Sequence, residues 1–289
     1  LAQLVARVKP STVFHLAAQP LVRHSYREPL ETFRTNVMGT AHLLEAVRRS
    51  GHPCTVVIIT TDKVYENAET PVPYRESDRL GGRDPYSASK AAAEMVAGSY
   101  RNSFFPPDRY HEHGVAVATA RAGNVIGGGD WSADRLLPDL VRAWVDGREA
   151  VIRNPEAVRP WQHVLDPLFG YLLLGERLYE EPGQFGSAWN FGPGREGNLT
   201  VRELAGQAAQ AYGFGTVRTV NLKNSPHEST LLRLDISKAK KELGWVPTLT
   251  TPEAIFWTME WYAAYRRNTG SMAGLSENQV ERFLHKTNP

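Results

Sequence analysis

A tyrosine and a lysine four residues apart, Tyr86 and Lys90, are the pair in this chain best suited to acid–base chemistry. Asp84 and Pro85 precede them, and this order predicts a helix with an aspartate N-cap and a proline in its first turn. A nearby ammonium and the helix N-terminus both favour a phenolate, so we expect the tyrosine pKa to fall from about 10 toward neutrality. Such a tyrosine could take the proton of a hydroxyl group while a hydride leaves the same carbon. The alternative is an ordinary pair on an exposed helix face.

A second polar cluster, Thr60-Thr61-Asp62-Lys63, ends a run of β-branched residues, Thr55–Thr60. That run predicts a strand covered on both faces. Ligands of open parallel sheets bind at the carboxyl edge, where this cluster falls. Asp62 and Lys63 are adjacent, so both can face one site only if the strand has already ended. The alternative is a turn that merely caps the strand.

The elements that must position these residues alternate along the first part of the chain. We expect helices at 1–9, 28–49 (ending at Gly51) and 85–100, and strands at 11–16, 55–60 and 115–120. This order predicts parallel strands joined by helical crossovers. Further along we expect a loop at 123–130, helices at 135–146, 167–179, 200–212, 237–243, 252–266 and 276–284, and strands at 188–191, 217–222 and 231–234.

This pattern predicts an α/β fold: a doubly wound parallel-sheet (Rossmann) core with a smaller α+β substrate-binding lobe. We assign residues 1–123 and 159–193 to the core, and residues 124–158 and 194–289 to the lobe.

Composition excludes several classes of protein. Lys+Arg 33 against Asp+Glu 31 leaves a net charge of +2, which favours neither nucleic acid nor an anionic membrane as the main partner. The single cysteine, Cys54, excludes an intrachain disulfide and a CxxC site, and is typical of a reducing compartment. The apolar runs are too short to span a bilayer, and no signal peptide is recognisable, so we expect a cytoplasmic protein.

The chain contains a literal G-x-G-x-x-G at Gly192–Gly197. Pro193 removes a backbone donor from this loop, and the following helix is expected to begin only at Thr200, with a capping box to Glu203. We therefore predict a turn and not a dinucleotide fingerprint. If the core binds a dinucleotide, we expect its glycine turn upstream of Leu1, because Leu1–Lys9 is typical of the last turns of a helix.

Five segments occur in an order that resembles the extended short-chain dehydrogenase/reductases, and among them the nucleotide-sugar 4,6-dehydratases. They are His15-Leu-Ala-Ala-Gln19, Thr35-Asn-Val-Met-Gly-Thr40, Thr61-Asp-Lys63, Tyr86-x-x-x-Lys90 and Arg121-Ala-Gly-Asn-Val125. Within that family the members that act on CDP-glucose are the most similar. The segments that carry this finer match are 19–23, 123–131 and 159–164, together with Lys63.

The resemblance implies a lyase that uses bound NAD to dehydrate CDP-glucose or a similar nucleotide sugar, supplying deoxysugars for O-antigen lipopolysaccharide. Tyr86, assisted by Lys90 and Thr61, would deprotonate the glucose 4-hydroxyl as C4 is oxidised. Water would leave across C5–C6 with Asp62 as the acid, which requires burial to raise its pKa, and the hydride would return to C6. Lys63 would be the C5 base or a cation that stabilises the enolate. Alternatives are another nucleotide-sugar dehydratase or epimerase, or a catalytically silent truncated binding protein.

The resemblance also implies binding residues. The predicted cofactor contacts are Ala17, Ala18, Gln19, Asn36, Thr60, Tyr86, Lys90 and Ala122, with Asn36 also holding backbone near the site. The predicted substrate contacts are Asn124, Arg135, Arg159, His227 and Glu228.

Three further features complete the sequence-based interpretation. Gly127–Gly129 could offer amide donors to an anion or merely turn the chain. His111 and His113 lack a third ligand nearby, so we predict no metal site. Helices 28–49 and 85–100 form a four-helix interface in relatives, which predicts a homodimer at least, with a tetramer as the larger option.

Overall fold

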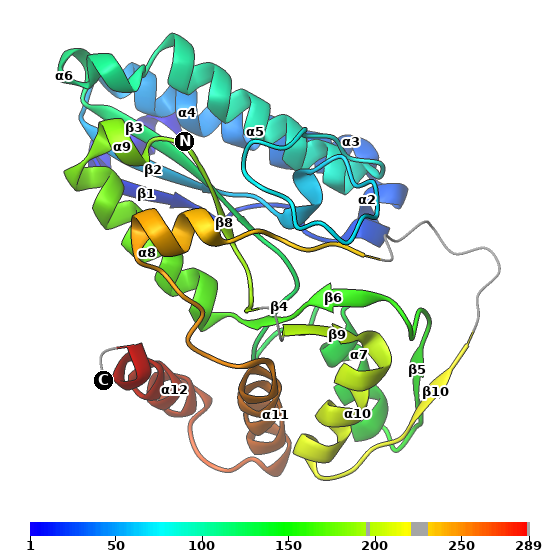
Figure 1. Ribbon diagram of the computed structural model, residues 1–289. Coiled ribbons are helices and arrows are strands. Elements are labelled where there is room, and N and C mark those ends of the chain that lie inside the picture. The colour runs from blue at the N-terminus through cyan, green and yellow to red at the C-terminus, as the bar shows by residue number, and fades with distance from the viewer. Residues whose placement is uncertain (195–196, 221–230, 288–289) are drawn as a thin grey trace. The chain divides into compact units, whose positions relative to one another are not determined.

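The computed structural model describes residues 1–194, 197–220 and 231–287, which form two compact units (Figure 1). Unit 1 comprises Leu1–Ala122, Phe169–Phe191 and Leu234–Trp245. Unit 2 comprises Gly123–Leu168, Gly192–Arg233 and Val246–Pro289. None of the helices within the described ranges is long and apolar enough to cross a membrane.

Unit 1 is built on a four-stranded parallel sheet with the order β1-β2-β3-β8. The strands are β1 (Thr12–His15), β2 (Cys54–Ile59), β3 (Val115–Ala122) and β8 (Ala188–Phe191). Every residue of β3 is buried, as expected for a strand with helices on both faces. The predicted parallel-sheet α/β core is confirmed.

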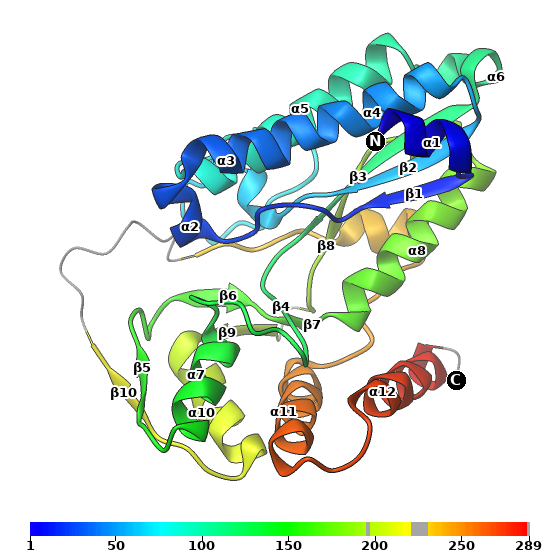
Figure 2. The same cartoon turned by 180° about the vertical axis from the view of Figure 1, so that it is seen from behind.

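Helices cover both faces of this sheet. α1 (Ala2–Val8), α4 (Gly39–Ser50) and α5 (Pro85–Ser103) lie on one face, and α8 (Leu165–Glu180) lies on the other (Figures 1 and 2). Val5, Leu44 and Val117 belong to the apolar cluster beneath the first group. On the opposite face, a Cβ at Gly175 of α8 would lie 2.7 Å from the Phe14 ring, so this glycine permits a close approach.

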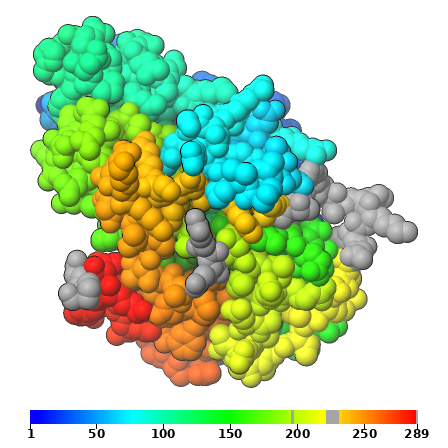
Figure 3. Space-filling model, viewed as in Figure 1, coloured from blue at the N-terminus to red at the C-terminus, as the bar shows by residue number. Residues whose placement is uncertain are grey.

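The remaining elements of unit 1 are short. They are α2 (Val22–Arg27), α3 (Pro29–Phe33), the 3-10 turns η2 (Asp62–Val64) and η3 (Pro107–Arg109), α6 (Tyr110–His113), α9 (Pro182–Phe185) and the π-helical η5 (Ala239–Leu243). The loop between η2 and α5 lies at the surface and forms much of the cyan area in Figure 3.

The predicted helix over 28–49 is a continuous helix with a π turn in its middle. α3 passes directly into η1 (Arg34–Met38), which has π geometry, and then into α4. The helix ends at Gly51, whose φ of 60° is left-handed, as its position predicted. The π turn was not predicted, because the apolar periodicity is similar on either side of it.

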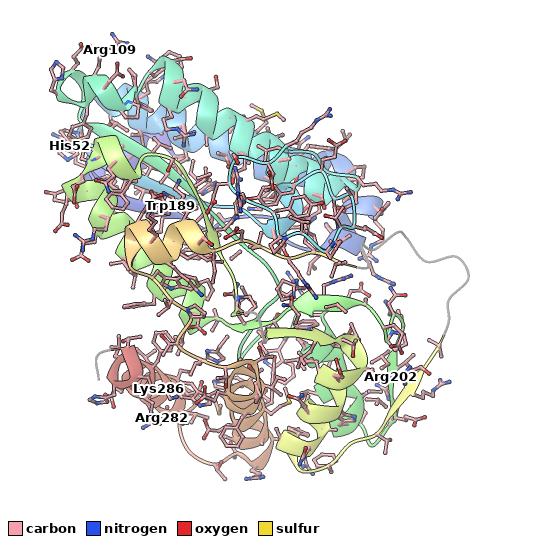
Figure 4. All side chains as sticks on the ribbon, in the orientation of Figure 1. His52, Arg109, Trp189, Arg202, Arg282 and Lys286 are labelled. Atoms are coloured by element: carbon pink, nitrogen blue, oxygen red, sulfur yellow. The ribbon has the colours of Figure 1, made fainter. Side chains whose placement is uncertain are left out.

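Unit 2 contains α7 (Leu136–Val145), α10 (Val201–Tyr212), α11 (Thr251–Arg267) and α12 (Met272–Thr287). Its strands form three pairs: β5 (Ala150–Ile152) with β10 (Val217–Thr219), β4 (Val125–Ile126) with β7 (Gln162–His163), and β6 (Val158–Pro160) with β9 (Asn198–Thr200). Two side chains of α12, Arg282 and Lys286 (Figure 4), form ion pairs with Glu260 and Glu253 of α11.

Some predictions for the second half of the chain were wrong. The segment 123–130 is not all loop, because Val125 and Ile126 pair with β7. The strand expected at 231–234 is absent among the described residues there, since Leu234 forms a single bridge to Tyr74. Strands of two or three residues such as β4 are too short to show a period in the sequence.

Candidate active site

The N-terminus of α5 is fixed by the residues that predicted it. The Asp84 carboxylate accepts hydrogen bonds from the Ser87 backbone N–H (3.0 Å) and from the Ser87 hydroxyl (2.6 Å), and Pro85 occupies the first turn. The Tyr86 N–H donates to the Ser25 hydroxyl of α2 (3.1 Å). These bonds anchor the first turn of α5 from two sides, and the predicted N-cap is confirmed.

Lys90 lies one turn further along α5 and is 6% exposed. Its Nζ donates to the carbonyl oxygen of Ile59, the last residue of β2, over 3.0 Å. Burial lowers the pKa of Lys90 to about 8, against an opposing effect of the Glu94 carboxylate. Tyr86 is also buried. The pair is therefore not an exposed helix pair, and Lys90 lies against the carboxyl end of the sheet.

The strand before the Thr61-Asp62-Lys63 segment has ended by Asp62, which is the condition for Asp62 and Lys63 to face one site. β2 ends at Ile59, and Asp62 begins the 3-10 turn η2, so the two charged residues are no longer constrained to opposite faces of a strand. The Thr61 hydroxyl donates to Asp62 Oδ1 (2.9 Å) and accepts from the Lys63 N–H (3.4 Å). Asp62 is 1% exposed. Its carboxyl is thus buried directly beyond the strand end.

Gln19 and Asn36 hold the backbone that follows β1. Asn36 Oδ1 accepts from the Gln19 N–H (2.8 Å), and its Nδ2 donates to the Gln19 carbonyl (3.0 Å) and to the Ser89 hydroxyl of α5 (2.8 Å). Asn36 lies within the π turn, a kind of helix irregularity that is frequent at functional sites. Ala17 and Ala18 lie in this same segment after β1, and Ala122 is the last residue of β3.

Three ionisable residues near Lys90 were not singled out from the sequence. His15, at the end of β1, has a pKa lowered to about 4 by burial and by the charge of Lys90. Glu94 of α5 and Arg121 of β3 form a buried ion pair (2.8 Å). The i+4 spacing of Glu94 from Lys90 is the one sequence signal that could have drawn attention to Glu94, and it does not indicate Arg121 as its partner.

The predicted substrate residues that the structure describes belong to unit 2. Asn124 has a left-handed φ of 47°, and its carbonyl accepts from the Gln162 N–H (3.3 Å). Arg135 is the N-cap residue of α7, and Arg159 is buried on β6 with its guanidinium donating to the Val158 carbonyl. His227 and Glu228 lie outside the described residues.

The glycine run of unit 2 is required by packing. A Cβ at Gly128 would lie 2.1 Å from the Trp261 side chain, one at Gly127 would lie 2.8 Å from Val164, and Gly129 has a φ of 82°. This favours the alternative in which the run turns the chain.

The second glycine motif, Gly192–Gly197, also behaves as its sequence predicted. The Gly197 N–H donates to the Gly194 carbonyl (2.9 Å), and residues 195 and 196 lie outside the described residues. Helix α10 begins only at Val201, with the Thr200–Glu203 capping box. No helix N-terminus follows this motif directly, as a dinucleotide fingerprint requires.

His113 is bound to its own loop. Its Nδ1 accepts from the Val115 N–H (3.0 Å), which leaves the proton on Nε2 to be donated to the Pro106 carbonyl (3.1 Å). Among the described residues no group of three or more His, Cys, Asp or Glu side chains could hold a metal ion.

A parallel sheet with helices on both faces, and with Lys90 of α5 bonded to the carboxyl end of β2, defines an α/β protein of the Rossmann type. Residues 1–256 match the family model for GDP-mannose 4,6 dehydratase, and the chain belongs to this family. It is 47% identical to CDP-glucose 4,6-dehydratase of Salmonella typhimurium, over 98% of this chain and 79% of that one. It is 33% identical to dTDP-glucose 4,6-dehydratase of Streptomyces antibioticus, over 86% and 69% of the two chains.

The fold has close counterparts among solved structures. The dTDP-glucose 4,6-dehydratase DesIV of Streptomyces venezuelae, solved with NAD bound, superposes with a TM-score of 0.79 at 28% identity. The match covers 92% of this chain and 78% of DesIV. The fold class and the family predicted from the sequence are confirmed.

Proposed function

We propose that this chain catalyses the NAD-dependent 4,6-dehydration of CDP-glucose to CDP-4-dehydro-6-deoxyglucose. The observation that carries the reaction type is the pairing of a buried lysine and tyrosine on α5 with the Thr61-Asp62-Lys63 turn beyond β2. The choice of nucleotide rests on the 47% identity to the Salmonella CDP-glucose 4,6-dehydratase.

In this proposal Tyr86 takes the proton of the 4-hydroxyl, and the Lys90 ammonium favours the phenolate that does so. Thr61 assists by turning its hydroxyl, which donates to Asp62 Oδ1 in the structure, toward the same 4-hydroxyl. Asp62, whose side chain is buried, protonates the departing 6-hydroxyl. Lys63 either removes the C5 proton or, as a cation, stabilises the enolate; both alternatives stay open.

The residues present fit the nicotinamide–ribose end of NAD. One of the three N–H donors of Lys90 bonds the Ile59 carbonyl, and the others suit ribose hydroxyl oxygens. Thr60, Gln19 and Ala122 lie at the carboxyl ends of neighbouring strands, where the family places this cofactor. When bound, NAD supplies the acceptor for the C4 hydrogen and its return to C6.

We further assign the cofactor to unit 1 and the nucleotide to unit 2, where Asn124, Arg135 and Arg159 lie. Arginine suits bidentate contacts with a diphosphate.

We also propose a homodimer. Leu30 of α3 (77% exposed), Met38 of η1 and Met95 of α5 (59% exposed) leave apolar side chains uncovered on the helices predicted to form the interface. Sedimentation of the purified protein over a concentration series tests this, and a monomer at all concentrations contradicts it.

The direct test is turnover measured by mass spectrometry. The protein with added NAD is offered CDP-glucose, dTDP-glucose, UDP-glucose and GDP-mannose in parallel. We expect the loss of one water from CDP-glucose alone. Water loss from another donor retains the reaction and overturns the CDP assignment, whereas no loss from any donor contradicts dehydration.

An isotope separates dehydration from epimerisation. CDP-glucose deuterated at C4 is expected to carry the deuterium to C6 of the product as water is lost. A 4-epimerase would return it to C4 with no water lost. Tyr86→Phe removes the proposed base and should lower kcat by about 10²–10⁴-fold, while the thermal unfolding midpoint should stay near that of the wild type.

A further inference from the structure

The buried ion pair beside Lys90 has a geometry that the proposed reaction does not itself explain. Arg121 of β3 makes a bidentate contact with Glu94 of α5: Nε donates to Oε1 (3.0 Å), and a terminal nitrogen donates to Oε2 (2.8 Å). The same carboxylate accepts the hydroxyls of Thr60 (2.5 Å) and Thr119 (2.8 Å). Four donors thus fix one carboxylate inside the sheet–helix interface.

These partners keep Glu94 ionised although it is buried. Burial alone would raise the pKa of Glu94, but the hydrogen bonds and charge of Arg121, with those from Thr60 and Thr119, bring it below its usual range. A buried carboxylate with this many donors is a rigid negative charge and not a group that titrates near neutrality.

Two features connect Glu94 to the proposed catalytic groups. Glu94 follows Lys90 by one helical turn, so its charge lies on the same face of α5. Thr60, which it binds, is the residue immediately before Thr61 and is held to β3 through its own N–H to the Ala120 carbonyl (2.8 Å). Glu94 therefore belongs to the helix that carries Lys90, and its carboxylate binds the residue that precedes Thr61.

We propose that Glu94, held by Arg121, is the positioning residue of this site: it places a fixed negative charge one helical turn from Lys90 and ties the end of β2 to α5. The inference rests on the role proposed for Lys90 above. Glu94 touches none of the reacting atoms; it acts through Lys90 and Thr60.

The other groups around Lys90 do not replace this charge. Ser25 of α2 and Asn36 of η1, which hydrogen-bond to this part of α5, are uncharged. The ionisable groups on the elements around Lys90 include His15 of β1, Glu31 of α3, Glu45 of α4, Asp62 and Lys63 of η2, Arg121 of β3, and Tyr86, Glu94 and Arg101 of α5. Of these, Glu94 is the carboxylate that raises the pKa of Lys90.

The test measures the ionisation of Lys90 itself. Lysine labelled with ¹³C at Cε gives one signal for each of the 8 lysines, and Lys90→Met assigns the one in question. In the wild type we expect a midpoint of about 8. In Glu94→Gln, which keeps the shape and removes the charge, the midpoint should fall by about one pH unit or more. Glu94→Asp, which keeps the charge, should stay within a few tenths of a unit.

Two further variants keep the test decisive. Tyr65→Phe removes an uncharged partner on the far side of Arg121 and should leave the Lys90 midpoint unchanged. If Glu94→Gln does not fold, Glu94→Gln combined with Arg121→Gln avoids an unpaired buried guanidinium, and the midpoint should still fall. An unchanged midpoint in Glu94→Gln, or in the double variant if only that one folds, overturns the proposal. So does a wild-type midpoint below about 7, because Lys90 would then be neutral at physiological pH.

Activity provides a separate readout. If a nucleotide sugar is turned over, the pH at which kcat falls on the alkaline side should decrease in Glu94→Gln by the same amount as the Lys90 midpoint. In Glu94→Asp this pH should be close to that of the wild type. A purely structural role would lower kcat equally at every pH. If the midpoint shifts but no donor is turned over, the proposed function fails and the coupling of Glu94 to Lys90 stands.

Discussion

Two buried carboxyl groups, one in each unit, have pKa values shifted in opposite directions. Glu94 in unit 1 has a pKa below its usual range, because Arg121 and two hydroxyls outweigh the effect of burial. Asp166 in unit 2 is also fully buried, and its Oδ1 accepts from the backbone N–H groups of Thr248 (2.6 Å) and Leu249 (3.4 Å). Burial raises the pKa of Asp166 to about 6. These two backbone donors thus lower the pKa of a buried carboxyl by less than burial raises it, whereas a guanidinium with two hydroxyls lowers it by more.

The residues buried around these two carboxyl groups also differ between the units. The core of unit 2 is rich in aromatic rings, such as the stacked Trp144 and Tyr212, and its buried His163 has a pKa lowered to about 4 by burial. In unit 2, burial thus shifts the pKa values of both groups in the direction of the neutral form. Unit 1 retains full charges next to Lys90, where the proposed chemistry requires them.

The largest effect should come from breaking the charged pair. Arg121→Met leaves the Glu94 carboxylate buried without its counter-charge, and we expect the free energy of unfolding to fall by about 3–5 kcal/mol. Urea denaturation at neutral pH measures this. Arg101→Met is a control on the same helix: Arg101 of α5 is partly buried and the charges of Glu94 and Arg121 affect its pKa, but it forms no ion pair among the described residues. Equal losses in the two variants would contradict the importance of the pair.

A smaller effect is expected at Asp166, and it depends on pH. The folded-state pKa is above the unfolded value, so the native state holds an extra proton between about pH 4 and 6, and the resulting stability is lost as the pH rises through this window. His163 has the opposite sign, because its lowered pKa makes the native state lose stability as the pH falls from about 6.5 to 4. In the wild type the two contributions largely cancel.

Asp166→Asn should remove that compensation. Relative to the wild type, its free energy of unfolding should increase by up to about 1.4 kcal/mol per pH unit between pH 4 and 6, and then level off. Urea unfolding at about pH 4.5, 5.5 and 7 measures this difference. His163→Gln should change the slope in the opposite direction. A difference independent of pH would show that the pKa of Asp166 is not raised in the folded state.

The smallest effect on stability should come from Tyr65, an uncharged hydrogen-bond partner of Arg121 in unit 1. The Tyr65 hydroxyl donates to Asn190 Oδ1 (2.7 Å) and accepts from Arg121 (2.9 Å). Tyr65→Phe removes both bonds but leaves the ion pair with Glu94, so a loss of about 1–2 kcal/mol is expected in the same urea titration. A loss as large as that of Arg121→Met would mean that hydrogen bonds, and not charge, stabilise this region.

Local signals in the sequence were sufficient to predict the parts of the candidate site that are contiguous in the chain. Asp84 and Pro85 predicted the start of α5, and the apolar run before Thr61 predicted β2, because capping and burial act over a few residues. The Glu94–Arg121 pair spans 27 residues and joins a helix to a strand, so no local pattern indicates it. The glycine run around Gly128 was ambiguous for the same reason, since its explanation is the distant Trp261.

The π turn at Arg34–Met38 has a consequence for insertions and deletions in this chain. A π turn holds one more residue than an α-helical turn, so losing a single residue there would allow an unbroken α-helix. The part of the helix before the turn would then rotate by about 100° relative to α4. Exposed Leu30 would leave the surface proposed to meet a second subunit, and Asn36 would leave the backbone of Gln19. Subunit pairing and the architecture of the site would therefore change together through a change in length, even with every other side chain intact.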